Sequence, residues 1–371
     1  MPHGQGMSAY LPIELDAFRD GNPFPVCLRD SFVSAGLRVE VGLSGLARNP
    51  GQWDAVCIQW PESLLAWRSP RASDVDSLDD WLRVAALRSA IVTTVHNETQ
   101  HADGGASSDR LFRTVYRRTR AFVHLGATSR GVTESRYPEE TKGKLHVVIP
   151  HGNYAILGPG IETTAARRHL GLPESRPVVL VIGSIRHLEE LQIVEWAARY
   201  LRREGATLAF AGKIGLAPAG SGAFGFARRL SARLREAALV RSLQRNASVV
   251  RVPAPVPHER MPAVASAADV VLIPRRLVLN SGVVPLGFTF GKVVVGPRHG
   301  VVGEILEANA NPTFPIDAGP GDIAHAIAQG LALSRQGRGA ANAQVACTHW
   351  DWGRIGADYA ALLRTLREVG T

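Results

Sequence analysis

The residues of this sequence best suited to chemistry are Asn280, Ser281 and Gly282, which stand between two apolar runs. The runs, 269–274 and 293–297, have the composition of buried strands, and the three residues are typical of a helix start. The first main-chain N–H groups of a helix lack partners within it and lie at the positive end of its dipole. We therefore expect an anion here, and a nucleotide diphosphate suits such a place.

The elements that must position these residues alternate between strand and helix along the whole chain. In the first half we expect strands at 39–41, 55–58, 90–95, 121–124 and 145–149, and helices near 24–36, 74–89 and 107–120. In the second half we expect strands at 178–182, 207–211, 248–252, 270–273 and 293–295, and helices near 188–204, 224–242, 258–267 and 321–335. Such alternation predicts an α/β fold with two mostly parallel, doubly wound sheets, whose ligands collect at the carboxyl ends of the strands.

A stretch rich in Gly, Pro and Thr, 151–177, interrupts the alternation and has the composition of a connection between domains. We predict an amino-terminal Rossmann-like domain over 1–160 and a carboxyl-terminal one over 161–352. The last helix, about 353–371, is expected to pack back on the first domain. The glycine-rich segment 215–225 favours a surface loop, because the strand and helix of a nucleotide-binding glycine loop do not flank it. A dehydrogenase of the Rossmann type is therefore disfavoured.

Composition limits the classes of protein that fit. The chain has 371 residues, 45% of them hydrophobic and 20% charged, and its three cysteines, Cys27, Cys57 and Cys347, lack the spacing of a zinc site. No signal peptide or long apolar run is evident, so we expect a cytoplasmic protein, either soluble or peripheral at the inner face of the membrane. The net charge of +9 favours anionic partners, although a GC-rich genome explains an arginine excess equally well. The positive charge is spread along the chain without interleaved aromatic residues, which argues against a nucleic-acid-binding protein.

Several short motifs occur in an order that resembles the family-4-like bacterial glycosyltransferases of exopolysaccharide and capsule synthesis, which have the GT-B fold. The motifs are 54–62 (Asp-Ala-Val-Cys-Ile-Gln-Trp-Pro-Glu), 94–97 (Thr-Val-His-Asn), 148–154 (Val-Ile-Pro-His-Gly-Asn-Tyr), 183–186 (Gly-Ser-Ile-Arg) and 280–282 followed by Gly291-Lys292. The resemblance implies two Rossmann-like domains facing each other across a cleft.

The same resemblance implies a reaction and its partners. A sugar moves from a nucleotide-diphosphate sugar, UDP- or GDP-linked, to a glycan or a polyprenyl-diphosphate-linked acceptor, with retention of the anomeric configuration. The nucleotide sugar is a co-substrate, so no cofactor is expected. No metal is expected either, because helix termini and basic side chains neutralise the leaving diphosphate in such enzymes. An anionic membrane surface is a further expected partner.

The resemblance also assigns residues near the reacting carbon. His96 and Asn97 follow the strand 90–95 and would emerge at the carboxyl edge of the sheet, where His96 contacts the sugar or acts as a base. Asn97 through Gln100 also resembles a helix-capping box, which leaves a structural role open. An inverting reaction would need a base, and Glu62, Glu98 and His96 are the candidates.

For the donor diphosphate the resemblance points to Gly183 and Arg186, since a guanidinium group binds phosphate oxygens in pairs. Glu189 occupies the place of an expected lysine, and Lys213 is a candidate to replace it, although a solvated surface lysine is an equal alternative. The family usually carries two glutamates eight residues apart around the phosphate-binding helix. Here those places hold Val278 and Leu286, so the ribose must be held differently or the donor is unusual.

A last group of residues is expected to form the acceptor side or the hinge between the domains. Gly21 and Asn22 belong to a turn after the first strand, and His151 and Tyr154 begin the interdomain connection. Ordinary turn geometry explains these residues nearly as well. The unusual residues at 189, 278 and 286 leave one rival function, a non-catalytic GT-B-like protein that binds a glycan or nucleotide and assists a partner transferase.

Overall fold

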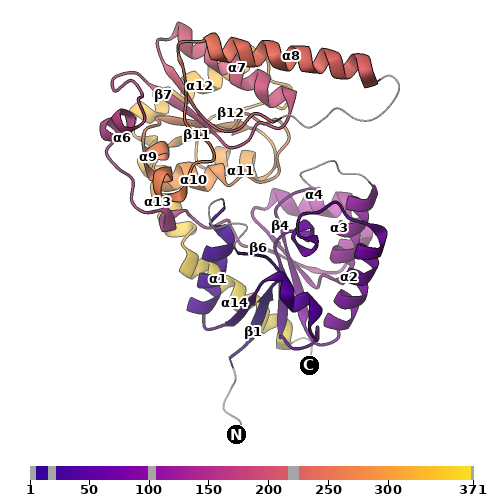
Figure 1. Ribbon diagram of the computed structural model, residues 1–371. Helices are drawn as coiled ribbons and strands as arrows, with labels where there is room; N and C mark the ends of the chain where they lie inside the picture. The colour runs from indigo at the N-terminus through magenta and orange to yellow at the C-terminus, as the bar shows by residue number, and fades with distance from the viewer. Residues whose placement is uncertain (1–5, 16–21, 99–105, 216–224, 369–371) are drawn as a thin grey trace. The chain divides into compact units, whose positions relative to one another are not determined.

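The computed structural model describes residues 6–15, 22–98, 106–215 and 225–368, and only the backbone of 225–232. The chain forms two compact units, Met1–Gly152 together with His349–Thr371, and Asn153–Thr348 (Figure 1). The sequence placed these two boundaries at 160 and 352, and the units divide after residues 152 and 348, the first of which lies within the connection 151–177 that the composition indicates.

In its described part, the first unit contains a parallel sheet with the strand order β2-β1-β3-β4-β5-β6. Its strands are β1 Ser8–Leu11, β2 Arg38–Val41, β3 Ala55–Ile58, β4 Ala90–Val95, β5 Ala121–His124 and β6 Leu145–Val148. Its helices are α1 Phe24–Ser34, α2 Ala72–Ala85, α3 Ala106–Arg118, α4 Thr128–Arg136, α5 Pro138–Thr141 and α14 Trp352–Glu368, with the 3-10 helices η2 Leu43–Ala47 and η3 Pro61–Leu65.

The carboxyl-terminal helix α14 belongs to the first unit and packs on α1 (Figure 1). Gly356 allows this approach, because a Cβ atom at this position would lie 2.2 Å from the Ser31 carbonyl oxygen. The Tyr359 ring packs 5.0 Å from that of Phe32, and its hydroxyl group lies 2.8 Å from the Thr94 hydroxyl on β4. One helix thus fixes both α1 and the strand that leads to His96.

The described part of the second unit also contains a parallel sheet, with the order β12-β11-β10-β7-β8-β9. Its strands are β7 Val178–Ile182, β8 Thr207–Ala211, β9 Val249–Arg251, β10 Val270–Leu272, β11 Val293–Pro297 and β12 Thr313–Phe314. Its helices are α6 Thr163–His169, α7 Leu188–Arg203, α8 Gly225–Arg245, α9 Met261–Ser266, α10 Val283–Thr289, α11 Gly300–Ala308, α12 Pro320–Arg335 and α13 Arg338–His349, with the 3-10 helices η4 Ala155–Leu157 and η5 His258–Arg260.

Helices cover both faces of the second sheet, as two glycines show. Gly287 of α10 lies against Val294, and Gly330 of α12 lies against Val295, the next residue of the same strand. Successive side chains of a strand point to opposite faces, so α10 and α12 lie on opposite sides of the sheet. The predicted α/β class with two doubly wound parallel sheets is therefore confirmed.

Candidate functional site

Three cationic residues follow neighbouring strands of the second sheet. Arg186 comes after β7, Lys213 after β8 and Arg275 after β10, and these strands are adjacent in the order β10-β7-β8. Because the strands are parallel, their carboxyl ends meet at one edge of the sheet, where open α/β folds bind ligands. Arg186 and Lys213 were predicted to lie there, and Arg275 was not.

Arg275 is tied to Glu190 at the start of α7. Its Nε atom lies 3.3 Å from Oε1 of Glu190, which is nearly buried, and its own side chain is 26% exposed. Burial lowers the pKa of Arg275, and the positive charge of Arg186 acts in the same direction. The other carboxylate oxygen of Glu190 accepts the main-chain N–H of Arg186 at 2.6 Å. Glu190 thus contacts both arginine segments and holds them next to each other.

Gly183, predicted to contact the donor, allows the ends of β7 and β8 to approach closely. Its φ of +101° is readily adopted only by glycine. A Cβ atom on Gly212 would lie 2.0 Å from the Gly183 carbonyl oxygen, so the two loops are in direct backbone contact. The N–H of Ile185 then donates to the carbonyl of Lys213 at 2.8 Å. These contacts fix the backbone on which Arg186 and Lys213 stand, and the Lys213 side chain is exposed.

The predicted anion-binding segment leads into α10, a helix of seven residues. The hydroxyl oxygen of Ser281 accepts the N–H of Val283 at 3.3 Å, and its carbonyl accepts the N–H of Val284 at 3.1 Å. Pro285, the third residue of α10, has no N–H group. Among the residues that the structure describes, the main-chain N–H groups of Ser281 and Gly282 are thus left for a ligand within this turn, and Asn280, Ser281 and Gly282 are all half-buried.

Tyr154, predicted at the hinge, packs on the first turn of α10. A Cβ atom on Gly282 would lie 2.6 Å from the Tyr154 hydroxyl oxygen. The N–H of Tyr154 donates to the Thr289 hydroxyl at 3.0 Å, at the other end of the same helix. Tyr154 therefore positions α10 within the second unit. The two places where glutamates were expected hold a half-buried Val278 and a buried Leu286, and neither side chain can accept a hydrogen bond from a ribose.

In the first unit, His96 lies at the end of β4 among aromatic rings. The Trp60 ring stacks on the imidazole with centroids 4.1 Å apart, and the Phe24 ring meets it edge-on at 5.0 Å. The Nε2 atom of His96 lies 3.2 Å from Oε1 of Gln59. The imidazole is 7% exposed, so this enclosure fixes its orientation before any substrate binds.

Phe24 also contacts His151, which was predicted on the acceptor side. The two ring centroids lie 4.7 Å apart, and Nδ1 of His151 lies 2.7 Å from the Gly152 carbonyl oxygen. Burial lowers the pKa of His151 to about 4, so this imidazole is neutral at pH 7. Asn22 accepts the N–H of Phe24 through its side-chain oxygen at 3.1 Å, and Gly21 lies outside the described residues. Phe24 thus brings Asn22, His96 and His151 together.

Glu62, a predicted catalytic residue, is almost fully buried in η3. It is 1% exposed, and neither carboxylate oxygen has a hydrogen-bond partner among the described residues. Burial raises the pKa of Glu62 to about 7, and burial also raises the pKa of Tyr116 on α3, to which the charge of Glu62 adds. A carboxyl group with such a pKa can exchange a proton near neutrality. Its burial means that a substrate must displace neighbouring side chains to touch it.

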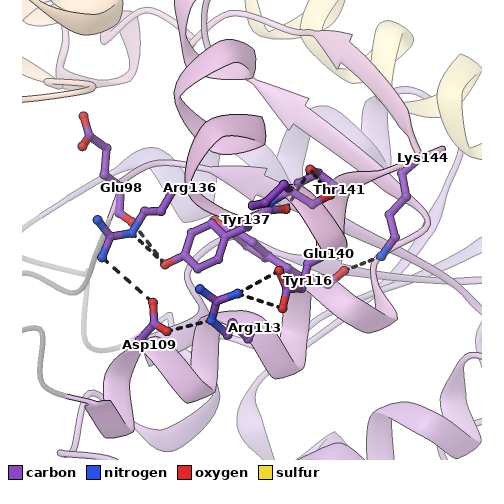
Figure 2. A network of polar contacts seen from close by, with 10 residues as sticks. Glu98, Asp109, Arg113, Tyr116, Arg136, Tyr137, Glu140, Thr141 and Lys144 are labelled. Atoms are coloured by element: carbon purple, nitrogen blue, oxygen red, sulfur yellow. Dashed lines mark hydrogen bonds and ion pairs between the residues drawn. The ribbon is translucent and has the colours of Figure 1, made fainter.

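Asn97 and Glu98 follow His96, and a polar network holds this segment (Figure 2). The Tyr137 hydroxyl group donates to the Glu98 carbonyl at 3.5 Å and accepts a hydrogen bond from Arg136 at 3.2 Å. Asn97 itself is half-buried. Arg113 joins α3 to α5 by contacting both carboxylate oxygens of Glu140 at 3.1 Å. The network therefore links three helices to the end of β4.

Two further observations concern metals and membranes. Over the ranges that the structure describes, no three His, Cys, Asp or Glu side chains lie close enough together to hold a metal ion. Within those same ranges, no helix is both long enough and apolar enough to cross a membrane. The predicted metal independence and peripheral location stay predictions.

Comparison with models of protein families finds no match for this chain, and comparison with curated protein sequences finds none either. Solved structures are similar along nearly its whole length. Sucrose-phosphate synthase from Thermosynechococcus elongatus has a TM-score of 0.70 and 15% identity, with 98% of this chain and 100% of that chain covered.

Two further solved structures carry ligands. The catalytic domain of starch synthase IV from Arabidopsis thaliana, bound to ADP and acarbose, has a TM-score of 0.68 and 11% identity, with 98% of this chain and 100% of that chain covered. HepE from Anabaena, in complex with UDP and glucose, has a TM-score of 0.67 and 12% identity, with 97% of this chain and 100% of that chain covered. With two parallel sheets in two Rossmann-like units, the chain has the GT-B fold that these proteins share.

Proposed function

We propose that this chain is a glycosyltransferase that moves a sugar from a nucleotide-diphosphate sugar to an acceptor hydroxyl group. The observation that carries the proposal is the line of Arg186, Arg275 and Lys213 along one edge of the second sheet, beside the start of α10. A diphosphate needs such a concentration of fixed positive charge. The same fold holds UDP and glucose in HepE, which supports a UDP-linked donor, with a GDP-linked donor as the alternative.

The reaction breaks the bond between the anomeric carbon and the diphosphate oxygen and forms a bond from that carbon to the acceptor oxygen. The acceptor hydroxyl loses a proton, and the nucleoside diphosphate leaves with the bonding electron pair. The cations and the N–H groups of Ser281 and Gly282 stabilise the charge that develops on the leaving oxygen, which supports a reaction without a metal. With retention, the departing phosphate oxygen accepts the proton.

The first unit is proposed to hold the sugar and the acceptor. His96 is proposed to contact the sugar near the reacting carbon, and the place of its imidazole at a strand end, held by Trp60 and Phe24, supports this role. Asn97 follows it at the same edge of the sheet. If the configuration is inverted, a base must remove the proton, and the raised pKa of Glu62 suits that task.

The acceptor is proposed to be a glycan or a polyprenyl-diphosphate-linked oligosaccharide in bacterial surface polysaccharide synthesis. The order of the sequence motifs supports this role. The protein is expected in the cytoplasm, peripheral at the inner face of the membrane, and the net charge of +9 supports contact with anionic lipid. Salt-sensitive sedimentation with acidic vesicles tests this contact, and its absence removes the membrane from the proposal.

Nucleotide binding tests the proposed function most directly. We expect UDP or GDP to raise the melting temperature, since a ligand that binds the folded state stabilises it. Arg186→Ala and Arg275→Met are each expected to weaken nucleotide binding about 10-fold or more, because each removes a charged contact to phosphate. Arg168→Ala is the matched control, since this exposed arginine of the same unit pairs with Glu174. Equal effects of all three substitutions contradict the assignment of the donor site.

The rival function, binding without transfer, has one observation in its favour. Val278 and Leu286 replace the two glutamates of similar enzymes, so the ribose lacks the usual carboxylate. Release of nucleoside diphosphate from UDP- or GDP-sugars separates the two functions. Turnover that persists in EDTA supports the metal-independent enzyme, whereas tight nucleotide binding without any release identifies a binding protein.

A further inference from the structure

Two consecutive residues after η3, Ala66 and Trp67, adopt the left-handed conformation. Their φ angles are 52° and 60°, and Ala310 is the one other described non-glycine residue with a positive φ. An L-residue rarely adopts this conformation, and for a bulky side chain it is a genuine outlier. Strain of this kind persists where the surrounding structure enforces it, and it concentrates at binding sites.

Successive main-chain hydrogen bonds enforce this turn. The N–H of Ala66 donates to the Ser63 carbonyl at 2.9 Å, that of Trp67 to the Glu62 carbonyl at 3.0 Å, and that of Arg68 to the Leu65 carbonyl at 3.1 Å. The residues that supply the carbonyls are buried, so the turn rests on a fixed base. A glycine would fit this backbone without strain, yet the chain carries a tryptophan.

The strained turn places the indole of Trp67 at the surface next to the His96 enclosure. Trp67 is 41% exposed, and its ring lies 5.9 Å from that of Trp60, centroid to centroid. Trp60 in turn stacks on His96 at 4.1 Å. The three rings form a row whose buried end is the imidazole and whose exposed end is the indole, so a group that packs on Trp67 lies two rings from His96.

We propose that Trp67 is the platform on which a sugar ring of the acceptor stacks. One face of a pyranose carries C–H groups and is apolar, whereas its rim carries hydroxyl groups, and a half-exposed indole matches that face. A tryptophan ring also loses little conformational freedom on binding, because it has only two side-chain torsions. The inference rests on the proposed function, since it takes the first unit as the acceptor side.

The cations of the second unit separate this ligand from the nucleotide. Arg186, Arg275 and Lys213 follow the strands of the other sheet, so the phosphate-binding residues belong to a different unit from Trp67. A neutral ring has no need of them. Arg68, the cation within the turn itself, donates its Nε–H to the Leu65 carbonyl at 3.2 Å. The turn at Trp67 therefore suits the uncharged sugar of an acceptor better than it suits the donor's diphosphate.

Kinetics with acceptor and donor varied separately test the platform. Trp67→Ala and Trp67→Asn are expected to raise the KM for the acceptor about 10-fold, as the loss of an aromatic stacking contact does, and to leave the KM for the donor within about twofold. The asparagine variant keeps the turn, because Asn tolerates the left-handed conformation. Leu87→Ala is the matched control, and it should change neither KM. Leu87 is 76% exposed and precedes β4, so it lies at the amino end of the strands of the same sheet.

A binding measurement on the wild-type chain needs a variant only to assign one signal. The protein is labelled with 5-fluorotryptophan and titrated with the methyl glycosides of glucose, galactose, mannose and N-acetylglucosamine, and Trp67→Phe identifies the Trp67 fluorine signal. We expect at least one glycoside to shift that signal. If none shifts it, or if acidic vesicles shift it instead, the platform is refuted. A glycoside-dependent shift in a chain that binds no nucleotide supports the platform and refutes the proposed transferase.

Discussion

Replacing Glu62 with glutamine should change how the stability of this protein depends on pH. The Glu62 carboxyl group is 1% exposed, and burial raises its pKa from 4.5 to about 7. In the folded state it therefore keeps its proton at pH values where the unfolded chain has released one. Between pH 4.5 and 7 the folded state binds more protons than the unfolded state, so the free energy of unfolding falls as the pH rises.

The size of this effect follows from the shift. A difference of about 2.5 pKa units corresponds to about 3 kcal/mol at 1.36 kcal/mol per unit. The stabilising term is complete below pH 4.5, is lost progressively as the pH rises toward 7, and is absent above about pH 8. Glutamine has nearly the same shape and cannot ionise. Glu62→Gln should therefore be more stable than the wild type at pH 9 by about 2 to 3 kcal/mol relative to their difference at pH 5.

Urea unfolding of both proteins from pH 5 to pH 9 measures this difference. Only the difference between the two proteins is informative, because every other titrating group contributes equally to both. Glu140→Gln is a suitable control, since this buried carboxylate is paired with Arg113. If the wild type and Glu62→Gln change in parallel, Glu62 titrates as an ordinary carboxylate, and its selection as a base with a near-neutral pKa fails.

Two glycines provide further predictions. Gly152→Ala should lower the free energy of unfolding of the first unit by about 1 to 3 kcal/mol in urea, because its Cβ atom would lie 2.2 Å from the Trp352 indole; no loss would show that the indole moves freely. Gly282→Ala should weaken nucleotide binding in calorimetry about 10-fold, since its Cβ atom would lie 2.6 Å from the Tyr154 hydroxyl and displace the start of α10. Adding Tyr154→Phe should restore most of the affinity, and a double variant no better than Gly282→Ala contradicts this cause.

The apolar runs of the sequence predict most of the strands, because a strand covered on both faces is hydrophobic throughout. The expected strand 90–95 is β4, and the expected strand 207–211 is β8. Every residue of both strands is buried. The first strand, β1, was not predicted, since Ser8–Leu11 is short and carries no β-branched residue. The expected helix 258–267 is interrupted, because η5 precedes α9 and a proline stands at the second position of that helix.

The candidate site was harder to predict than the fold. Residues that directly follow a strand, such as His96 and Arg186, could be placed at the carboxyl edge from the pattern alone. Arg275 was missed, although it stands soon after an apolar run in the same way, and that position is the signal that could have found it. The burial of Glu62 and the left-handed turn at Trp67 depend on tertiary packing, and no local sequence pattern encodes either.

The buried ionisable groups discussed above differ in charge between the two units, and this difference supports the proposed division of roles. In the first unit, burial lowers the pKa of His151 to about 4 and raises that of Glu62 to about 7, so at neutral pH the imidazole is uncharged and the carboxyl group is protonated about half of the time. In the second unit, Glu190 pairs with Arg275 and keeps the guanidinium group charged despite its burial. A neutral, aromatic surface suits an uncharged sugar and its hydroxyl group, whereas fixed cations suit a leaving diphosphate.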